Sequence, residues 1–234
     1  MSRRVVVNAD DFGLTSGVNR AVVEAHVDGI VTSTTAMVRQ PAAAEAAALA
    51  RAHPRLGVGL HVDLGEWAFR DGDWVALYTV VDPADHDAVA REVDHQVGRF
   101  CRLFGRLPTH LDSHQHVHDS SPAREVVAAA ASGLGVPVRG GGGIRYVGGF
   151  YGQLSKGGPY HEAITVDALV ALLADLPPGA SEVACHPGYP EGLADTGTMY
   201  VAEREAELRV LCDPRVRAAV GEAGIELVTF AEVA

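Results

Sequence analysis

The chain has 234 residues, of which 47% are apolar, 21% charged and 6% aromatic, and its formal net charge is −11. An apolar fraction this high excludes an intrinsically disordered chain, and the length allows a substantial core without disulfides or structural metals. The excess of acidic residues and the presence of only one lysine, Lys156, argue against binding to nucleic acid or to an anionic membrane surface.

The cysteines and the start of the chain predict a cytoplasmic protein. Cys101, Cys185 and Cys212 are odd in number and far apart, which is typical of reduced thiols rather than a disulfide framework. The apolar run that follows Met1 is too short for a signal peptide, and no later run approaches the roughly 20 apolar residues of a membrane span.

Short β-branched runs alternate along the chain with apolar residues at helical spacing. The first part of the chain predicts a strand at 5–7, a helix from 18 that ends at Gly29, a strand at 30–38, a helix at 42–52, a strand at 56–62 and an inserted loop over 65–85. The middle part predicts a helix at 89–104 that ends at Gly105, a strand at 108–111, a helix that starts at Ser121-Pro122, a strand at 136–138 and a loop opened by glycines 140–143. The last part predicts a helix at 166–174, a strand at 182–185, a loop at 186–199, a helix at 200–212 and a strand at 225–228.

This alternation of strands and helices predicts an α/β fold built on a parallel sheet. About seven strand–helix units follow one another without a long linker. We therefore expect one domain over residues 1–234, with the architecture of a single distorted (β/α) TIM-like barrel of about seven parallel strands.

Unusual polar residues stand directly after the strand runs, one group per strand. Asp10 and Asp11 follow the first strand, His61 and Asp63 end the third, and further groups lie at 110–118, at Arg139 and at Cys185-His186. The carboxyl ends of parallel strands share one side of a sheet or barrel, and active sites are built there from separate strands. Five such groups predict a common site, in preference to scattered polar loop residues.

Two of these groups indicate a metal. Adjacent carboxylates at Asp10 and Asp11 would repel each other unless a cation compensates them, although a turn and a helix cap also use Asp. Four of the 11 histidines lie within 110–118, and His114, His116 and His118 would share one face of an extended chain. An Asp/His/His set with an open position is typical of hydrolytic and Lewis-acid metal centres.

Other catalytic motifs are absent from the sequence. It contains no phosphate-binding Gly-x-x-x-x-Gly-Lys-Ser/Thr loop, no Gly-x-Gly-x-x-Gly after the first strand and no Gly-x-Ser-x-Gly elbow. Nucleotide cofactors and a covalent nucleophile are therefore not expected. We interpret the glycines at 140–143 as a mobile loop over the site.

Six ordered motifs run along the chain: VNADDFGL at 7–14, GIVTSTTA at 29–36, GLH at 59–61, FGR at 104–106 with PTHLDSH at 108–114, VH at 117–118 and CHP at 185–187. Together they resemble the YdjC-like (ChbG/HpnK) carbohydrate deacetylase family. The resemblance implies a metal-dependent hydrolase that removes acetyl groups from N-acetylated sugars on a distorted β/α barrel.

The resemblance also implies roles for individual residues. Asp11, His61 and His114 would bind one divalent ion, Mg²⁺ or Zn²⁺, and Asp10 would be the catalytic base. His186 stands where related polysaccharide deacetylases place a proton-donating histidine, which is a looser correspondence.

Several interpretations stay open at this point. Arg139 and His118 could each contact a sugar or a phosphate. Equally, Arg139 could form a structural ion pair and His118 could be a core histidine. Trp67 and Trp74 either stack on a sugar ring or pack the insertion down. The rival functions are a metal-dependent phosphoesterase on a similar barrel and a catalytically silent sugar- or metal-binding protein. A homodimer is expected only from the general frequency of dimers.

Overall fold

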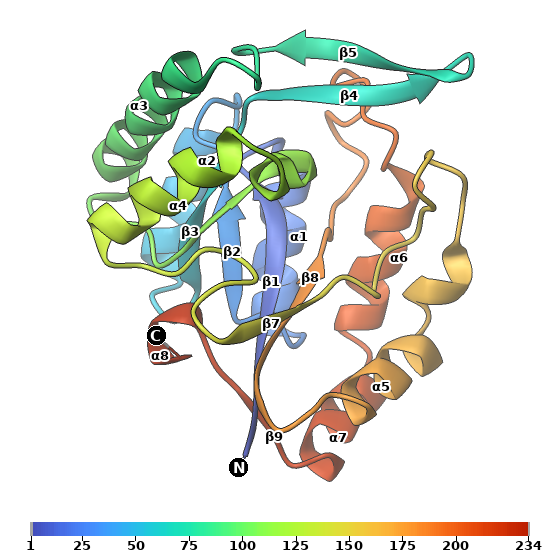
Figure 1. Cartoon of the computed structure of the whole chain (residues 1–234). Coiled ribbons are helices and arrows are strands. Elements are labelled where there is room, and N and C mark those ends of the chain that lie inside the picture. The colour runs from blue at the N-terminus through green and yellow to red at the C-terminus, as the bar shows by residue number, and fades with distance from the viewer. Residues whose placement is uncertain (1, 234) are drawn as a thin grey trace.

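The computed structural model describes residues 2–233, and its centre is a seven-stranded parallel sheet (Figure 1). The strands run in the order β6-β3-β2-β1-β8-β7, with β9 paired to the start of β1. Their bounds are β1 (Arg3–Phe12), β2 (Ser33–Ala36), β3 (Gly57–Val62), β6 (Leu111–Ser113), β7 (Ile144–Val147), β8 (Gly179–Cys185) and β9 (Ile225–Leu227). The predicted α/β class and parallel sheet are confirmed.

The sheet curls into a distorted, partly closed barrel, as predicted, because one segment links its two edges. Val138 forms a parallel bridge with Leu111 of β6, and the Arg139 N–H donates to the Leu111 carbonyl at 2.9 Å. A few residues later the chain pairs with β8 on the opposite edge, as β7. The strand predicted at 136–138 is therefore wrong in position: only a single bridge forms there, and the strand lies at 144–147.

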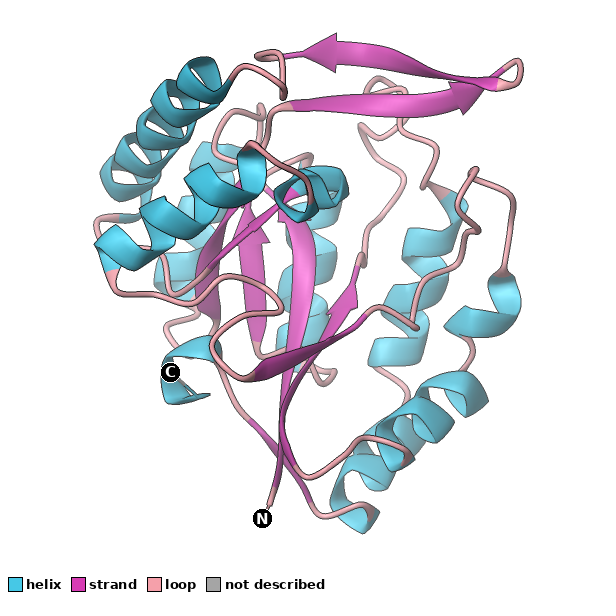
Figure 2. Ribbon diagram, in the orientation of Figure 1, coloured by secondary structure: helices cyan, strands magenta, loops and turns pink. Residues whose placement is uncertain are grey.

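Helices cover the outside of the sheet (Figure 2). They are α1 (Ser16–Val27), α2 (Ala43–Ala52), α3 (His86–Phe104), α4 (Ala123–Leu134), α5 (Val166–Ala174), α6 (Ala202–Leu211), α7 (Pro214–Glu222) and α8 (Phe230–Val233), with short 3₁₀ turns η1 (His114–Asp119) and η2 (His161–Ile164). The helices α7 and α8 were not predicted from the sequence. Asp213 caps α7 and Pro214 starts it, which is a local start signal just beyond the predicted end of the preceding helix.

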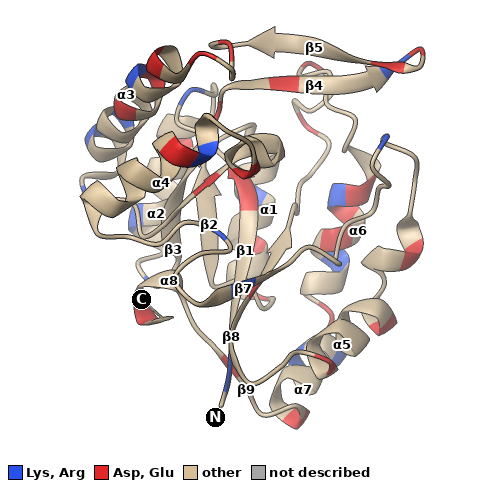
Figure 3. Cartoon of the chain, viewed as in Figure 1, with Lys and Arg blue, Asp and Glu red and all other residues tan. Residues whose placement is uncertain are grey.

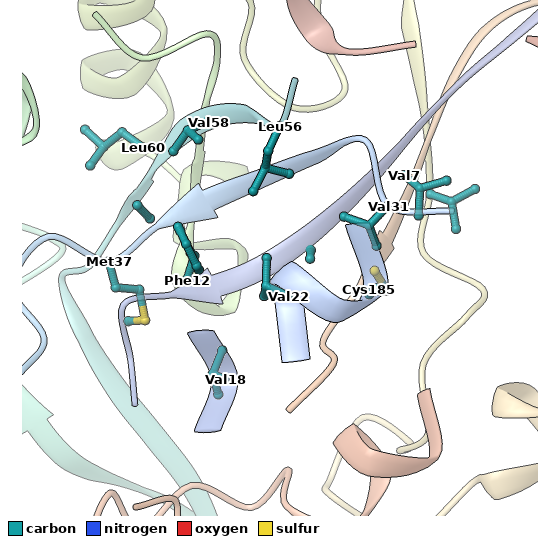
Figure 4. Close-up of a cluster of buried hydrophobic side chains, with 14 of the residues drawn as sticks. Val7, Phe12, Val18, Val22, Val31, Met37, Leu56, Val58, Leu60 and Cys185 are labelled. Carbon is teal, nitrogen blue, oxygen red and sulfur yellow. The ribbon is translucent and has the colours of Figure 1, made fainter. Parts of the chain in front are cut away.

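The core lies between the sheet and its helices, and Figure 4 shows part of it. Phe12 of β1 and Leu60 of β3 are fully buried, as are Val18 and Val22 on the inner face of α1. Charged residues lie on the helices, and acidic and basic positions are interspersed along α3 and α6 (Figure 3). Within residues 2–233, no helix combines the length and the apolar character needed to cross a membrane.

A β-hairpin occupies the region where a loop over 65–85 was predicted. Its strands β4 (Gly65–Arg70) and β5 (Asp73–Thr79) form a separate antiparallel sheet across the end of the barrel toward which the main strands point (Figure 1). Asp71 and Gly72 join them with φ values of 52° and 93°. An Asp-Gly pair with left-handed φ values is a strong signal for a tight hairpin turn. The region was predicted as a loop because its residues show no clear strand or helix periodicity.

Candidate active site

The strand ends bring the predicted catalytic and metal-binding residues into one cavity of about 560 Å³. Asp10 and Asp11 end β1, His61 lies near the end of β3, His114 follows β6 and His186 follows β8. All five line this cavity. The rule that carboxyl ends of parallel strands meet at one side therefore placed these side chains correctly relative to one another.

A bulge in β1 turns both aspartates toward the cavity. Successive residues of a regular strand point to opposite faces, so Asp10 and Asp11 would normally diverge. The pairing of β1 with β2 shifts register between Ala9 and Phe12, and Asp11 adopts a left-handed φ of 66°. Strained backbone of this kind is held at functional sites by its surroundings. Both carboxylates consequently line the same space.

Three side chains converge at distances that fit a metal ion. Asp11 Oδ1 lies 3.3 Å from His61 Nε2 and 3.3 Å from His114 Nδ1. Ligands bonded to a metal at about 2.0–2.2 Å are separated by roughly 3–3.5 Å. Asp11 Oδ1 is buried and has no hydrogen-bond partner, so it is a free ligand atom. The donor set of one carboxylate and two imidazoles fits a divalent cation.

A buried carboxylate fixes the orientation of His61. Asp112 Oδ1 accepts a hydrogen bond from His61 Nδ1 at 2.7 Å, and Thr35 donates to Asp112 Oδ2 at 3.0 Å. In the neutral ring with its proton on Nδ1, Nε2 carries the lone pair and faces Asp11. This carboxylate–histidine arrangement orients metal ligands in many proteins. Asp112 lies within the PTHLDSH motif at 108–114, and the sequence alone predicts no role for it.

The histidines after β6 do not form the extended row that the alternating pattern predicted. Gln115 and His116 have left-handed φ values of 50° and 54°, which fold the segment into the η1 turn. Of the three alternating histidines, only His114 lies close to Asp11. His116 lines the cavity and lies 3.2 Å from the Tyr146 hydroxyl. His118 turns away, with its Nδ1 hydrogen-bonded to Ser113 Oγ at 2.6 Å.

Arg139 holds Asp10 in place. Its guanidinium donates to both oxygens of Asp10, at 2.7 and 2.6 Å, and also reaches Asp112 at 2.8 Å and Glu182 at 2.7 Å. Burial alone would raise the pKa of Asp10, but the Arg139 charge keeps that pKa well below its usual range. Asp10 is therefore an ionised carboxylate with a fixed orientation.

The predicted substrate contacts of Arg139 and His118 are not placed at the cavity. Among the described residues, neither side chain belongs to the cavity lining, and both are buried. Arg139 lies behind Asp10, where its charge is satisfied by three carboxylates. The structure therefore corrects both expectations in favour of the ion pair and the core histidine.

His186 faces Asp10 from the end of β8. Its Nε2 lies 3.7 Å from Asp10 Oδ2, and its ring packs edge-on against Tyr151 and Tyr200. The backbone N–H of His186 donates to the Glu207 carboxyl group, which is also hydrogen-bonded to the Tyr200 hydroxyl. Burial lowers the pKa of His186 to about 4, so its imidazole is neutral near pH 7.

Two buried residues of α6, neither of them predicted from the sequence, complete the site. Arg204 donates to Asp11 Oδ2 at 2.6 Å, and its charge keeps the pKa of Asp11 well below the usual range although burial acts to raise it. Glu207 supports His186. In sequence, α6 contains charged residues of both signs, which is typical of an exposed helix surface, so one sequence gives no signal for their burial.

The glycines at 140–143 are not the loop over the site. They connect Arg139 to β7, and Gly140, Gly142 and Gly143 have left-handed φ values that only glycine adopts readily. Residues between Tyr146 and Gly157 and between Thr198 and Tyr200 line the cavity instead. The glycines form the turn that links the two edges of the sheet. The segment that follows them forms part of the cavity wall.

Comparisons with known proteins agree on one family. Residues 4–222 match the model of the YdjC-like protein family. The chain is 35% identical to a carbohydrate deacetylase of Geobacillus stearothermophilus, covering 99% of this chain and 98% of the relative. It is 36% identical to a chitooligosaccharide deacetylase of Klebsiella pneumoniae, with both chains covered completely.

A solved structure from Enterococcus faecalis, provisionally described as a cellobiose-phosphate cleavage protein, superimposes with a TM-score of 0.82 at 26% identity and full coverage of both chains. The family model matches nearly the whole length of the chain, and the two deacetylases align with it over nearly their full lengths. Both comparisons therefore assign the chain to the same family. The chain belongs to the YdjC-like protein family.

Proposed function

We propose that this protein is a metal-dependent carbohydrate deacetylase that hydrolyses the acetamide group of N-acetylated sugars. The observation that supports it most directly is the unpartnered Asp11 Oδ1 at 3.3 Å from a nitrogen of His61 and of His114, next to an ionised Asp10. The carbohydrate and chitooligosaccharide deacetylases among its relatives support the same substrate class.

Asp11, His61 and His114 would hold the divalent ion, Mg²⁺ or Zn²⁺. When bound, such an ion polarises a carbonyl group and lowers the pKa of a bound water to about 7. The protein's own contribution is to fix the geometry. Asp112 orients His61, while Arg204 occupies the second oxygen of Asp11 and leaves one oxygen for the ion.

Asp10 and His186 would move the protons. In amide hydrolysis the water oxygen bonds to the acetyl carbon, the carbon–nitrogen bond breaks, and the amine leaves with a proton from an acid. Asp10 is ionised and can accept the proton of water, held in orientation by Arg139. His186 is neutral at rest, so it must receive a proton before donating one, and Asp10 Oδ2 lies 3.7 Å away.

The charges around the site favour one ion over two. Asp10, His61 and Asp112 form a second group with ligand spacing, but Arg139 already donates to both carboxylates of that group. A guanidinium and a cation would compete for the same oxygens. A single ion favours deacetylation over the phosphoester hydrolysis that clustered metals serve.

Acetate release tests this proposal. The purified protein is incubated with N-acetylglucosamine oligomers after removal of metal by a chelator, and then with Mg²⁺ or Zn²⁺ restored. We expect acetate and a free amine only with the metal, and no release by the Asp10→Asn variant. A protein that binds the oligomers without releasing acetate under any metal would instead be the silent sugar-binding protein.

Two broader features belong to the same proposal. The three cysteines are free, which favours the reducing cytoplasm as the place of action. The site draws on residues from Asp10 to Glu207, which supports one catalytic domain spanning the chain. The homodimer stays a prediction.

A further inference from the structure

One face of the β4–β5 hairpin presents three aromatic rings. Phe69 lies opposite Trp74 in the antiparallel register, and Trp67 lies opposite Ala76. Opposed residues share a face, and so do residues two apart on one strand, so Trp67, Phe69 and Trp74 point the same way. Both tryptophans line the cavity. This aromatic face is therefore the cavity wall contributed by the hairpin.

Trp74 is unusually open for a tryptophan. It is 47% exposed, and its ring meets Phe69 edge-on with centroids 5.7 Å apart. Phe69 supports one side of the indole, while nearly half of the residue stays in contact with solvent. A flat aromatic surface at the wall of a cavity offers the apolar face of a sugar ring a large contact area at small entropic cost.

The hairpin's geometry sets the distance of Trp74 from the reacting group. Glu66, near the start of β4, lies at the active centre, and its Oε2 is 3.8 Å from His114 Nε2. From Glu66 to Phe69 a strand advances by about 10 Å, and Trp74 lies across from Phe69. A single pyranose ring with its acetyl group at the active centre does not extend that far. Trp74 is placed for the next ring of a longer substrate.

Hydrogen bonds hold the hairpin at this distance. The Gln115 side chain accepts from the Trp67 N–H at 3.0 Å and donates to the Trp67 carbonyl at 2.8 Å, which joins the hairpin to the residue after His114. Farther out, the Arg70 guanidinium donates to the Gly197 carbonyl at 3.3 Å. The aromatic face is thus fixed relative to the active centre before any substrate binds.

We propose that Trp74, supported by Phe69, forms a second sugar-binding position, so that the protein selects acetylated oligosaccharides of two or more units over the monosaccharide. This inference rests on the proposed deacetylase function. It assigns Trp74 the recognition of the sugar ring beside the one that loses its acetyl group.

The test compares Trp74→Ala with Val75→Ala. Val75 is the adjacent residue on the same strand, is 46% exposed, and points to the opposite face. The metal-loaded enzyme is assayed for acetate release from di-N-acetylchitobiose, and N-acetylglucosamine is titrated as a competitor to obtain its inhibition constant. Trp74→Ala should lower kcat/KM for the disaccharide by about tenfold, mainly through KM, because a stacked aromatic contact is lost.

The inhibition constant of the monosaccharide should stay unchanged in Trp74→Ala, and Val75→Ala should match the wild type in both measurements. Trp74→Phe should recover most of the lost efficiency. Equal disaccharide kinetics in the two alanine variants would overturn the second position, as would an equal loss of monosaccharide affinity. A shift of Trp74→Ala to a different oligomeric state on gel filtration would identify Trp74 as a subunit contact instead. Absence of acetate release by the wild type would contradict the proposed function itself.

Discussion

Asp112 accepts a hydrogen bond from His61 at 2.7 Å through one oxygen and pairs with Arg139 at 2.8 Å through the other. Arg139 in turn holds both oxygens of Asp10. A single buried carboxylate therefore connects a candidate metal ligand to the candidate base. The two halves of the proposed chemistry share one rigid support, although neither Asp112 nor Arg139 lines the cavity.

The Asp112→Asn variant should bind the metal about 10- to 100-fold more weakly. An amide of the same shape must point its NH₂ group either at the His61 N–H or at the Arg139 guanidinium, and both are donors. The metal dissociation constant, measured by competition with a chromophoric chelator, checks this. Unchanged affinity in a folded variant would contradict the role of Asp112 in orienting His61.

Substitution should separate the metal ligands from the base. Asp10→Asn is expected to bind metal like the wild type but to lose nearly all turnover, because it keeps the ligand set and removes the proton acceptor. His114→Ala should lose the metal. His118→Ala is the control, since His118 turns away from the ligand group and should leave one ion bound. Metal content after dialysis, measured in parallel with acetate release, distinguishes the three variants. Retention of the metal by His114→Ala would rule out His114 as a metal ligand.

Arg139→Met should destabilise the fold by about 3–5 kcal/mol, because it leaves the Asp10, Asp112 and Glu182 carboxylates buried without their cation. Arg145→Met is the control on the neighbouring strand, since Arg145 is exposed. Its free energy of unfolding should stay within about 0.5 kcal/mol of the wild type. Urea denaturation measures both, and equal stability of the two variants would refute the structural role of Arg139.

Glu207 should make stability depend on pH. Burial raises its pKa from 4.5 to about 8, so the folded state prefers the protonated acid. Below pH 4.5 the carboxyl group is protonated in both states, and as pH rises toward 8 the unfolded chain ionises first, which favours unfolding. The advantage in Tm of the wild type over Glu207→Gln should therefore shrink between pH 5 and 8. Glu205→Gln, an exposed neighbour, should show a constant difference.

The strands and most of the site were predictable because they depend on local pattern and one topological rule. β-branched runs marked β1, β3 and β8, and polar residues directly after them had to meet at one end of a parallel sheet. The shared position of Asp10, Asp11 and the histidines of the ligand group follows from this rule without any knowledge of contacts.

The remaining features depend on contacts between distant residues or on backbone detail. Arg139 and Asp10 are 129 residues apart, and nothing local distinguishes a buried ion pair from an exposed substrate contact. Arg204 lies in a helix whose charged sequence suggests exposure. The left-handed φ of Asp11 and the turn at Gln115 decide which side chains face the cavity, and single-sequence periodicity does not report backbone strain of this kind.

Anomalous diffraction from a crystal grown with Zn²⁺ or Mn²⁺ tests the metal centre most directly. We predict one strong peak about 2.0–2.2 Å from Asp11 Oδ1 and from one ring nitrogen each of His61 and His114, with Asp10 unbonded beside it. A peak at His116, His118 and Asp119 instead, or metal bound through Asp10, would contradict the account.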